Sequence, residues 1–132
     1  MRSLKTKGFA RFAKREGLPD EVLCRAAEAM DRGLIDADLG GGVVKQRIAR
    51  SGQGKSGGYR VIVAFRRRGR AVFVFGYAKS SRGGVDAREL RGFRLLAKLL
   101  LAMSPDDVDR ALEAGALEEV RCDEEAREAV RQ

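Results

Sequence analysis

Three consecutive runs of strand length lie between residues 43 and 78, and they constrain the fold more than any other feature of the sequence. Residues 43–50, 59–66 and 71–78 are rich in β-branched and aromatic side chains that recur with a period of two. Turn residues separate the runs: 51–58 contains four glycines, and 66–70 offers Gly69 for a position of positive φ. Three short strands joined in this way predict an antiparallel meander.

Helical periodicity flanks the strands on both sides. Apolar residues recur at helical spacing, and glycine or proline stands where helices would end or begin. The predicted helices cover four ranges: 5–16, 19–33, 85–103 and 104–115. The remaining segments are a connection over 34–42 and a stretch, 117–122, that is ambiguous between strand and coil. This order predicts an α+β fold with N-terminal helices, a three- to four-stranded antiparallel meander and C-terminal helices.

The length of 132 residues predicts a single domain. We expect a core over 5–103 and an acidic helical extension over 104–132. The chain has no signal-like start and no apolar segment long enough to span a bilayer, so we expect a soluble cytoplasmic protein. Cys24 and Cys122 can form a disulfide, but in a chain with no secretion signal we expect reduced thiols, with Cys24 as a small core residue.

The charge of the chain is divided sharply along its length. The formal net charge is +8, yet residues 104–132 contain ten carboxylates and four arginines. Residues 39–85 contain eleven cations and no carboxylate at all. Solvated surfaces usually mix the two signs, so this acid-free stretch predicts a polyphosphate partner. Two points stay open: the basic face could lack a specific partner, and the acidic end could dock on it or remain solvated.

The sequence contains no histidine, which excludes histidine-based acid–base chemistry and any zinc site that needs imidazole. The strands also lack the inward carboxylates of a metal-dependent nuclease, so we expect no metal and no cofactor. RNA carries its own nucleophile, the 2′-hydroxyl. Cleavage needs a base, cations for the phosphorane and an acid for the 5′-oxygen. A lysine crowded by cations can be the base, and arginine can clamp the phosphate.

The glycine-rich segment 52–56 resembles a nucleotide-binding P-loop only superficially. The first glycine of that motif would fall at Ala49, and no helix follows Ser56. Two interpretations remain open: a hairpin loop without a role, or a loop whose small residues admit a nucleic-acid backbone, with Lys55 as the contact.

Strand alternation brings basic residues together on the predicted sheet. Lys45 and Arg47 are two residues apart and share a face. In the third run, alternation places Phe73, Phe75 and Tyr77 together and opposite Val72, Val74, Gly76 and Ala78. A cluster at one end of the sheet is expected to hold four catalytic candidates: Lys45, Arg47, Arg60 and Lys79. On residue types alone, a passive RNA-binding sheet fits this cluster as well as a catalyst does.

Five sequence blocks, taken together, resemble the RelE/HigB branch of type II bacterial toxins. The blocks are KGFARF (7–12), GGGVVKQRIAR (40–50), GKSGGYR (54–60), FGYAK (75–79) and GALEEV (115–120). The resemblance spans about residues 5–121. It implies a small sheet flanked by helices and a metal-independent endoribonuclease that cuts mRNA in the A site of the 30S ribosomal subunit. It also implies a cognate antitoxin, expected to be of the helix-turn-helix type.

The resemblance assigns roles to the basic residues. Arg60 matches the phosphate-binding arginine, and Lys45 and Arg47 match a basic pair of which one is proposed as the base. Lys79 matches the residue that serves the leaving group, with Arg82 as a nearby substitute. The expected RNA contacts are Arg50, Lys55, Arg66, Tyr77 and Arg82.

One departure from the family concerns the substrate base. Some members stack it on a tyrosine near the C-terminus, but no tyrosine follows Tyr77 here. The resemblance therefore leaves base orientation to Tyr77, Phe93 or the ribosome. Two other functions stay open: a non-catalytic RNA-binding module, and a ParE-like gyrase inhibitor on a related scaffold.

Overall fold

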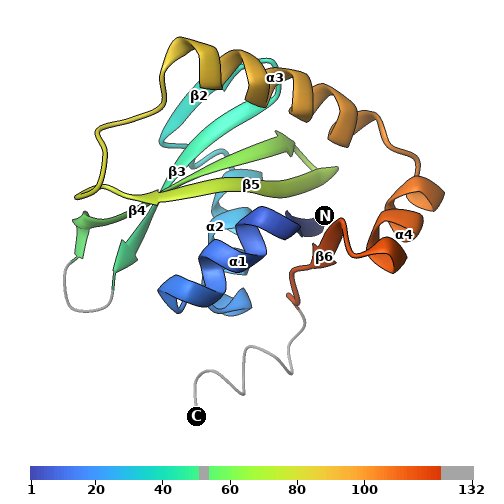
Figure 1. Ribbon diagram of the computed structural model, residues 1–132, viewed down its shortest axis with the longest axis horizontal. Helices are drawn as coiled ribbons and strands as arrows, with labels where there is room; N and C mark the ends of the chain where they lie inside the picture. The colour runs from blue at the N-terminus through green and yellow to red at the C-terminus, as the bar shows by residue number, and fades with distance from the viewer. Residues whose placement is uncertain (51–53, 123–132) are drawn as a thin grey trace.

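The computed structural model describes residues 1–50 and 54–122, without the side chains of 50 and 54–57. Within these ranges the chain forms an α+β fold (Figure 1). The elements in chain order are β1 (Arg2–Thr6), α1 (Lys7–Glu16), α2 (Asp20–Asp31), β2 (Ala37–Gly40), β3 (Val43–Arg50), β4 (Gly54–Arg66), β5 (Arg70–Ala78), α3 (Ala87–Ala102), α4 (Pro105–Ala114) and β6 (Leu117–Glu119).

The strands form a single sheet in the order β2-β3-β4-β5-β1-β6. β1 runs parallel to β5, and the other neighbours are antiparallel. Helices α1 and α2 pack on one face, which we call the α1/α2 face, and α3 and α4 pack on the other, the α3 face (Figure 1). Each face has its own apolar cluster, centred on Phe9 and Phe73 in the first case and on Ile62 and Leu100 in the second. The sheet is therefore the middle layer of three.

The α+β class and the central β3–β4–β5 meander were predicted from the sequence, but the sheet is larger than predicted. β1 replaces the first two residues of the expected 5–16 helix, β2 lies within the expected connection, and β4 begins inside the expected glycine loop. These strands are fixed by pairing with distant segments. β1, for example, lies between β5 and β6, and its Leu4 is fully buried. Such pairing between distant segments cannot be predicted from a local sequence pattern.

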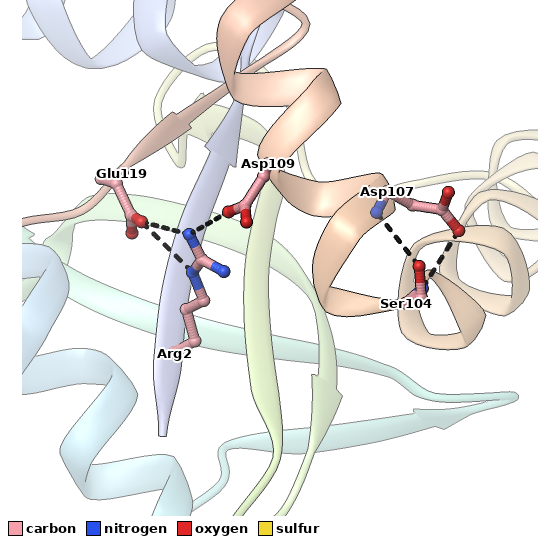
Figure 2. Close-up of polar contacts among 5 residues, drawn as sticks. All are labelled: Arg2, Ser104, Asp107, Asp109 and Glu119. Atoms are coloured by element: carbon pink, nitrogen blue, oxygen red, sulfur yellow. Dashed lines mark hydrogen bonds and ion pairs between the residues drawn. The ribbon is translucent and has the colours of Figure 1, made fainter.

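Helix α4 and strand β6 are built into the fold. Val108 and Leu117 are buried in the cluster of the α3 face. Arg2 of β1 donates hydrogen bonds to Glu119 of β6 and Asp109 of α4, at 2.7 and 3.3 Å from its Nη2 (Figure 2). Asp109 and Glu119, two acids of the segment expected to be an extension, thus supply partners for the first strand.

The helix ends follow the sequence signals. In α4 the Ser104 hydroxyl accepts from the Asp107 N–H, and the Asp107 carboxylate accepts from the Ser104 N–H, which forms a capping box (Figure 2). Gly17 and Gly115 end α1 and α4 in the left-handed conformation. Among the described residues, no helix is long and apolar enough to cross a membrane.

The β4–β5 turn differs from the prediction. Arg68, with φ of 58°, takes the left-handed conformation that the sequence assigned to Gly69. The Arg68 N–H donates to the Asp31 carboxylate at 2.6 Å. This contact ties the turn to the end of α2 and helps to hold a non-glycine residue at positive φ.

The expectation of two reduced thiols is wrong for this structure. Cys24 of α2 and Cys122, just beyond β6, form a disulfide with their Cα atoms 5.4 Å apart. Asp20 explains the approach, because its carboxylate accepts both the Arg121 N–H and the Lys5 ammonium at 2.9 Å. The segment after β6 is thereby fixed against α2. The two cysteines are 98 residues apart in the sequence, so their proximity in the fold could not be predicted from it.

Candidate functional site

Three predicted site residues lie on the α3 face of the central strands. Strand register places Arg47, Arg60 and Tyr77 side by side on β3, β4 and β5. Neighbouring strands are about 4.8 Å apart, so Arg60 lies between the other two side chains. We call this set the Arg47–Arg60–Tyr77 row.

Lys45 belongs to the next row of the same face. It is paired with Ile62, which in turn is paired with Phe75. Lys45 is therefore diagonal to Arg60, a relation that puts Cα atoms about 7–8 Å apart and within reach of long side chains. Lys45 and Arg60 are both half-buried, whereas Arg47 is exposed. The structure thus brings together Lys45, Arg47 and Arg60.

A β-bulge in β5 decides which aromatic rings reach this face. Ile62 pairs with Phe75 but Val63 pairs with Phe73, so Val74 is an extra residue without a partner in β4. Phe73 therefore packs on the α1/α2 face, whereas Phe75 and Tyr77 lie on the α3 face. The predicted grouping of all three rings on one face is wrong, because strict alternation does not survive a bulge.

Gly76 allows α1 to approach the back of β5. A Cβ atom at this position would lie 2.3 Å from Cε2 of Phe12, a distance that no real contact adopts. Gly76 therefore faces α1, opposite to its neighbours Phe75 and Tyr77.

Arg82 folds back from the segment after β5 and covers the two rings. Its guanidinium carbon lies 5.7 Å from the centre of the Phe75 ring and 5.5 Å from that of Tyr77. Both terminal nitrogens bond to the Glu89 carboxylate of α3, and Nε donates to the Gly84 carbonyl at 2.9 Å. Three contacts therefore fix the plane of this guanidinium.

Glu89 is a residue that the sequence analysis missed. Its carboxylate also accepts the Asp86 N–H at 3.0 Å, as part of a capping box at the start of α3. The D-x-x-E spacing of 86–89 was a visible signal of this box. The contact between Glu89 and Arg82 had no such signal in the sequence, because it depends on how the segment 79–86 turns.

We expect Glu89 to titrate below the range of a free glutamate. The Arg82 guanidinium, followed by the Asp86 N–H, lowers the pKa of the Glu89 carboxyl. A depressed pKa in the folded state stabilises the fold above the unfolded pKa, and this contribution is lost as the pH falls through the folded value. NMR titration of the Glu89 side-chain carbon should show the low midpoint, and Arg82→Ala should raise it. An unchanged midpoint in Arg82→Ala would contradict the pairing.

Tyr77 lies beneath Arg82 with an exposure of 5%. Burial raises the pKa of its phenol, although the nearby Arg60 and Arg82 oppose the shift. The phenol therefore stays protonated at neutral pH and is a donor rather than a base. Among the described residues, its hydroxyl has no hydrogen-bond partner.

Lys79 lies just beyond the row, where β5 ends. Its N–H donates to the Gly58 carbonyl at 3.0 Å, so its backbone lies beside Gly58 of β4, two residues before Arg60. A turn closed by the Ser81 N–H and the Ala78 carbonyl follows, and the Lys79 side chain is exposed. Lys79 is thus close to the Arg47–Arg60–Tyr77 row in the sheet, although no hydrogen bond fixes its ammonium there among the described contacts.

Of the other predicted RNA contacts, Arg66 does not join the cluster. Arg66 lies at the opposite end of β4, where its Nη2 donates to the Leu101 carbonyl at 2.9 Å. The side chains of Arg50 and Lys55 lie outside the described residues. Arg47 pairs with Asp36 at 3.5 Å, and both groups remain partly exposed, so screening makes this a weak interaction.

Together, these positions define a cationic surface built on rigid strands, with two aromatic rings and a fixed guanidinium at its border. The ion pairs described for the acids of 104–119 join Asp109 and Glu119 to Arg2, and Asp107 to Arg110, and none of these arginines belongs to this surface. Such a surface is suited to a polyanionic chain, because arginine side chains bind phosphate oxygens bidentately.

The family comparison agrees with this description. Residues 1–120 match the family model described as the RelE toxin of the RelE/RelB toxin–antitoxin system. This protein is therefore the toxin of a toxin–antitoxin system, a class that implies an antitoxin partner. The chain belongs to the RelE toxin family, whose members are generally endoribonucleases. No curated protein matches the sequence.

Proposed function

We propose that this toxin is a metal-independent endoribonuclease that cleaves mRNA in the ribosomal A site and so inhibits translation. The observation that carries the proposal is the Arg47–Arg60–Tyr77 row with Lys45 diagonal to Arg60, four predicted site residues on one face of the sheet. The family membership supports the same reaction class.

The proposed reaction uses the nucleophile of the RNA itself. Lys45 acts as the base that takes the proton of the 2′-hydroxyl, and the 2′-oxygen attacks the adjacent phosphorus. Arg60 and Arg47 neutralise the phosphorane. The bond from phosphorus to the 5′-oxygen then breaks, and Lys79 supplies the proton that this oxygen needs. The products are a 2′,3′-cyclic phosphate and a 5′-hydroxyl.

The chemical groups at the ends of the cleaved mRNA fragments test this reaction directly. Purified protein added to ribosomes programmed with mRNA should cut the message within the A-site codon. The downstream fragments should carry 5′-hydroxyl ends, because water does not enter the bond-breaking step. Ligation of an adaptor should therefore require prior phosphorylation by a kinase, which sequencing of the ligated ends would show.

Three other outcomes would contradict the proposal. Fragments with 5′-phosphate ends would indicate hydrolysis by an external nucleophile. Intact mRNA with salt-sensitive RNA binding would indicate a non-catalytic module, whose affinity should fall by about 0.7 log units per log of salt for each single-strand phosphate bound. Intact mRNA with DNA breaks would indicate a ParE-like gyrase inhibitor.

A further inference from the structure

The cations of the site can bind the phosphates of RNA, but a bound RNA also needs a surface that holds one of its nucleobases. Bases of single-stranded RNA are held by stacking on aromatic rings or on guanidinium planes. Tyr77 is 5% exposed and lies under Arg82, and Phe93 is half-buried with its ring centre 5.4 Å from that of Phe75. Tyr77 is therefore covered, and the Phe93 ring is in contact with Phe75 rather than with the Arg47–Arg60–Tyr77 row.

Arg82 offers the flat surface that these rings do not. One side of its guanidinium lies over Phe75 and Tyr77, and its side chain remains 35% exposed. The contacts with Glu89 and Gly84 use hydrogens at the edge of the plane and leave the opposite face uncovered by them. A guanidinium held on aromatic rings in this way is pre-organised for stacking.

The charge of Glu89 distinguishes this role from phosphate binding. A carboxylate that bonds to both terminal nitrogens offsets the charge of Arg82 and occupies the fork that a phosphate would use. The part of Arg82 that stays available is the planar, weakly hydrated face of its guanidinium, next to the Arg47–Arg60–Tyr77 row. Tyr77 links the two parts, since it is paired with Arg60 and covered by Arg82.

We infer that the guanidinium of Arg82 is the platform on which one nucleobase of the substrate RNA stacks, and that Glu89 is the positioning residue that holds this platform. The inference rests on the proposed function, because it assigns the base contact of the same site.

Binding of short RNAs tests the inference separately from cleavage. The probe is a fluorescein-labelled hexanucleotide with 2′-O-methyl groups, which block the nucleophile, and six derivatives that each lack one base. Fluorescence anisotropy at low salt gives the affinities. In the wild type, removal of one particular base should lower the affinity about tenfold, which corresponds to the loss of one stacked base.

The variants separate stacking from charge. Arg82→Ala should bind the intact RNA as weakly as the wild type binds that abasic RNA, and removal of the base should then have no further effect. Arg82→Lys should also lose the base discrimination, since it keeps the charge but not the plane. Glu89→Gln should reduce the discrimination while the affinity for the abasic RNA stays equal or rises, because a negative charge has been removed. If Glu89 had a merely structural role, Glu89→Gln would lower both the base discrimination and the affinity for the abasic RNA.

Arg88→Ala is the matched control, since Arg88 is an exposed arginine at the start of the same helix. It should keep the wild-type discrimination. Thermal melts should show that every variant is folded at the assay temperature. The inference is overturned if Arg82→Ala weakens all seven RNAs equally, or if the wild type binds all seven with equal affinity or binds none of them. The proposed function is decided separately, by the ends of the fragments cut on the ribosome.

Discussion

Replacement of Arg60 by alanine is expected to lower the rate of mRNA cleavage on the ribosome by about 10²–10³-fold, the usual effect of removing one preorganised donor to a developing charge. Arg60 occupies the centre of the site, between Arg47 and Tyr77 and diagonal to Lys45. An arginine remains charged at every working pH, so its loss removes a cation that no protonation change can restore. The measurement is single-turnover cleavage at saturating ribosomes, followed by primer extension.

Two further variants make the Arg60 result interpretable. Arg60→Lys keeps the charge but loses the bidentate fork, so an intermediate rate is expected. Arg11→Ala removes an exposed arginine of α1, on the opposite side of the sheet, and should cleave like the wild type. If Arg60→Ala cleaves within about threefold of the wild type while its affinity for ribosomes falls, Arg60 is a binding residue rather than a phosphorane ligand.

The sequence was sufficient to place the basic side of this site. Lys45, Arg47 and Arg60 share a face because regular pairing over residues 43–48 of β3 and 59–64 of β4 links sequence parity to orientation. The position of Lys79 could not be fixed in the same way, because the chain turns as soon as β5 ends. Residues 51–53 of the glycine loop and the side chain of Lys55 lie outside the described part of the chain, so the two interpretations of this loop stay predictions.

The aromatic side of the site was not predictable from the sequence, because two non-local features determine it. The bulge at Val74 reverses the orientation of every later residue of β5, and strand alternation contains no sign of it. The position of Arg82 depends on Glu89, seven residues later and on another element. Similarly, β1 and β6 are short and charged. They become strands only because each completes the hydrogen bonds of a neighbour distant in sequence.

The second large effect is expected at Gly76, where substitution by alanine should lower the free energy of unfolding by about 1–3 kcal/mol. The added methyl group would lie 2.3 Å from Cε2 of Phe12, and that ring is itself packed against Phe9 and Tyr59, so it cannot move aside without loss of contacts. Urea denaturation with an unchanged m-value measures the loss. Phe12→Leu in the same background should recover part of it, because the two sites share one contact.

Gly92→Ala is the same chemical change as Gly76→Ala, but it should change the free energy of unfolding in the opposite direction. Gly92 lies in the interior of α3, with no atom within 4 Å of an added Cβ, so alanine should raise the free energy of unfolding by about 1 kcal/mol. The two variants should also differ in activity. Gly76 lies between Phe75 and Tyr77, so a shift of β5 away from α1 moves the rings on which Arg82 rests, whereas Gly92 faces solvent. Equal stability of Gly76→Ala and the wild type would show that α1 does not set the position of the strand, and would remove the link between the packing of Phe12 and the geometry of the site.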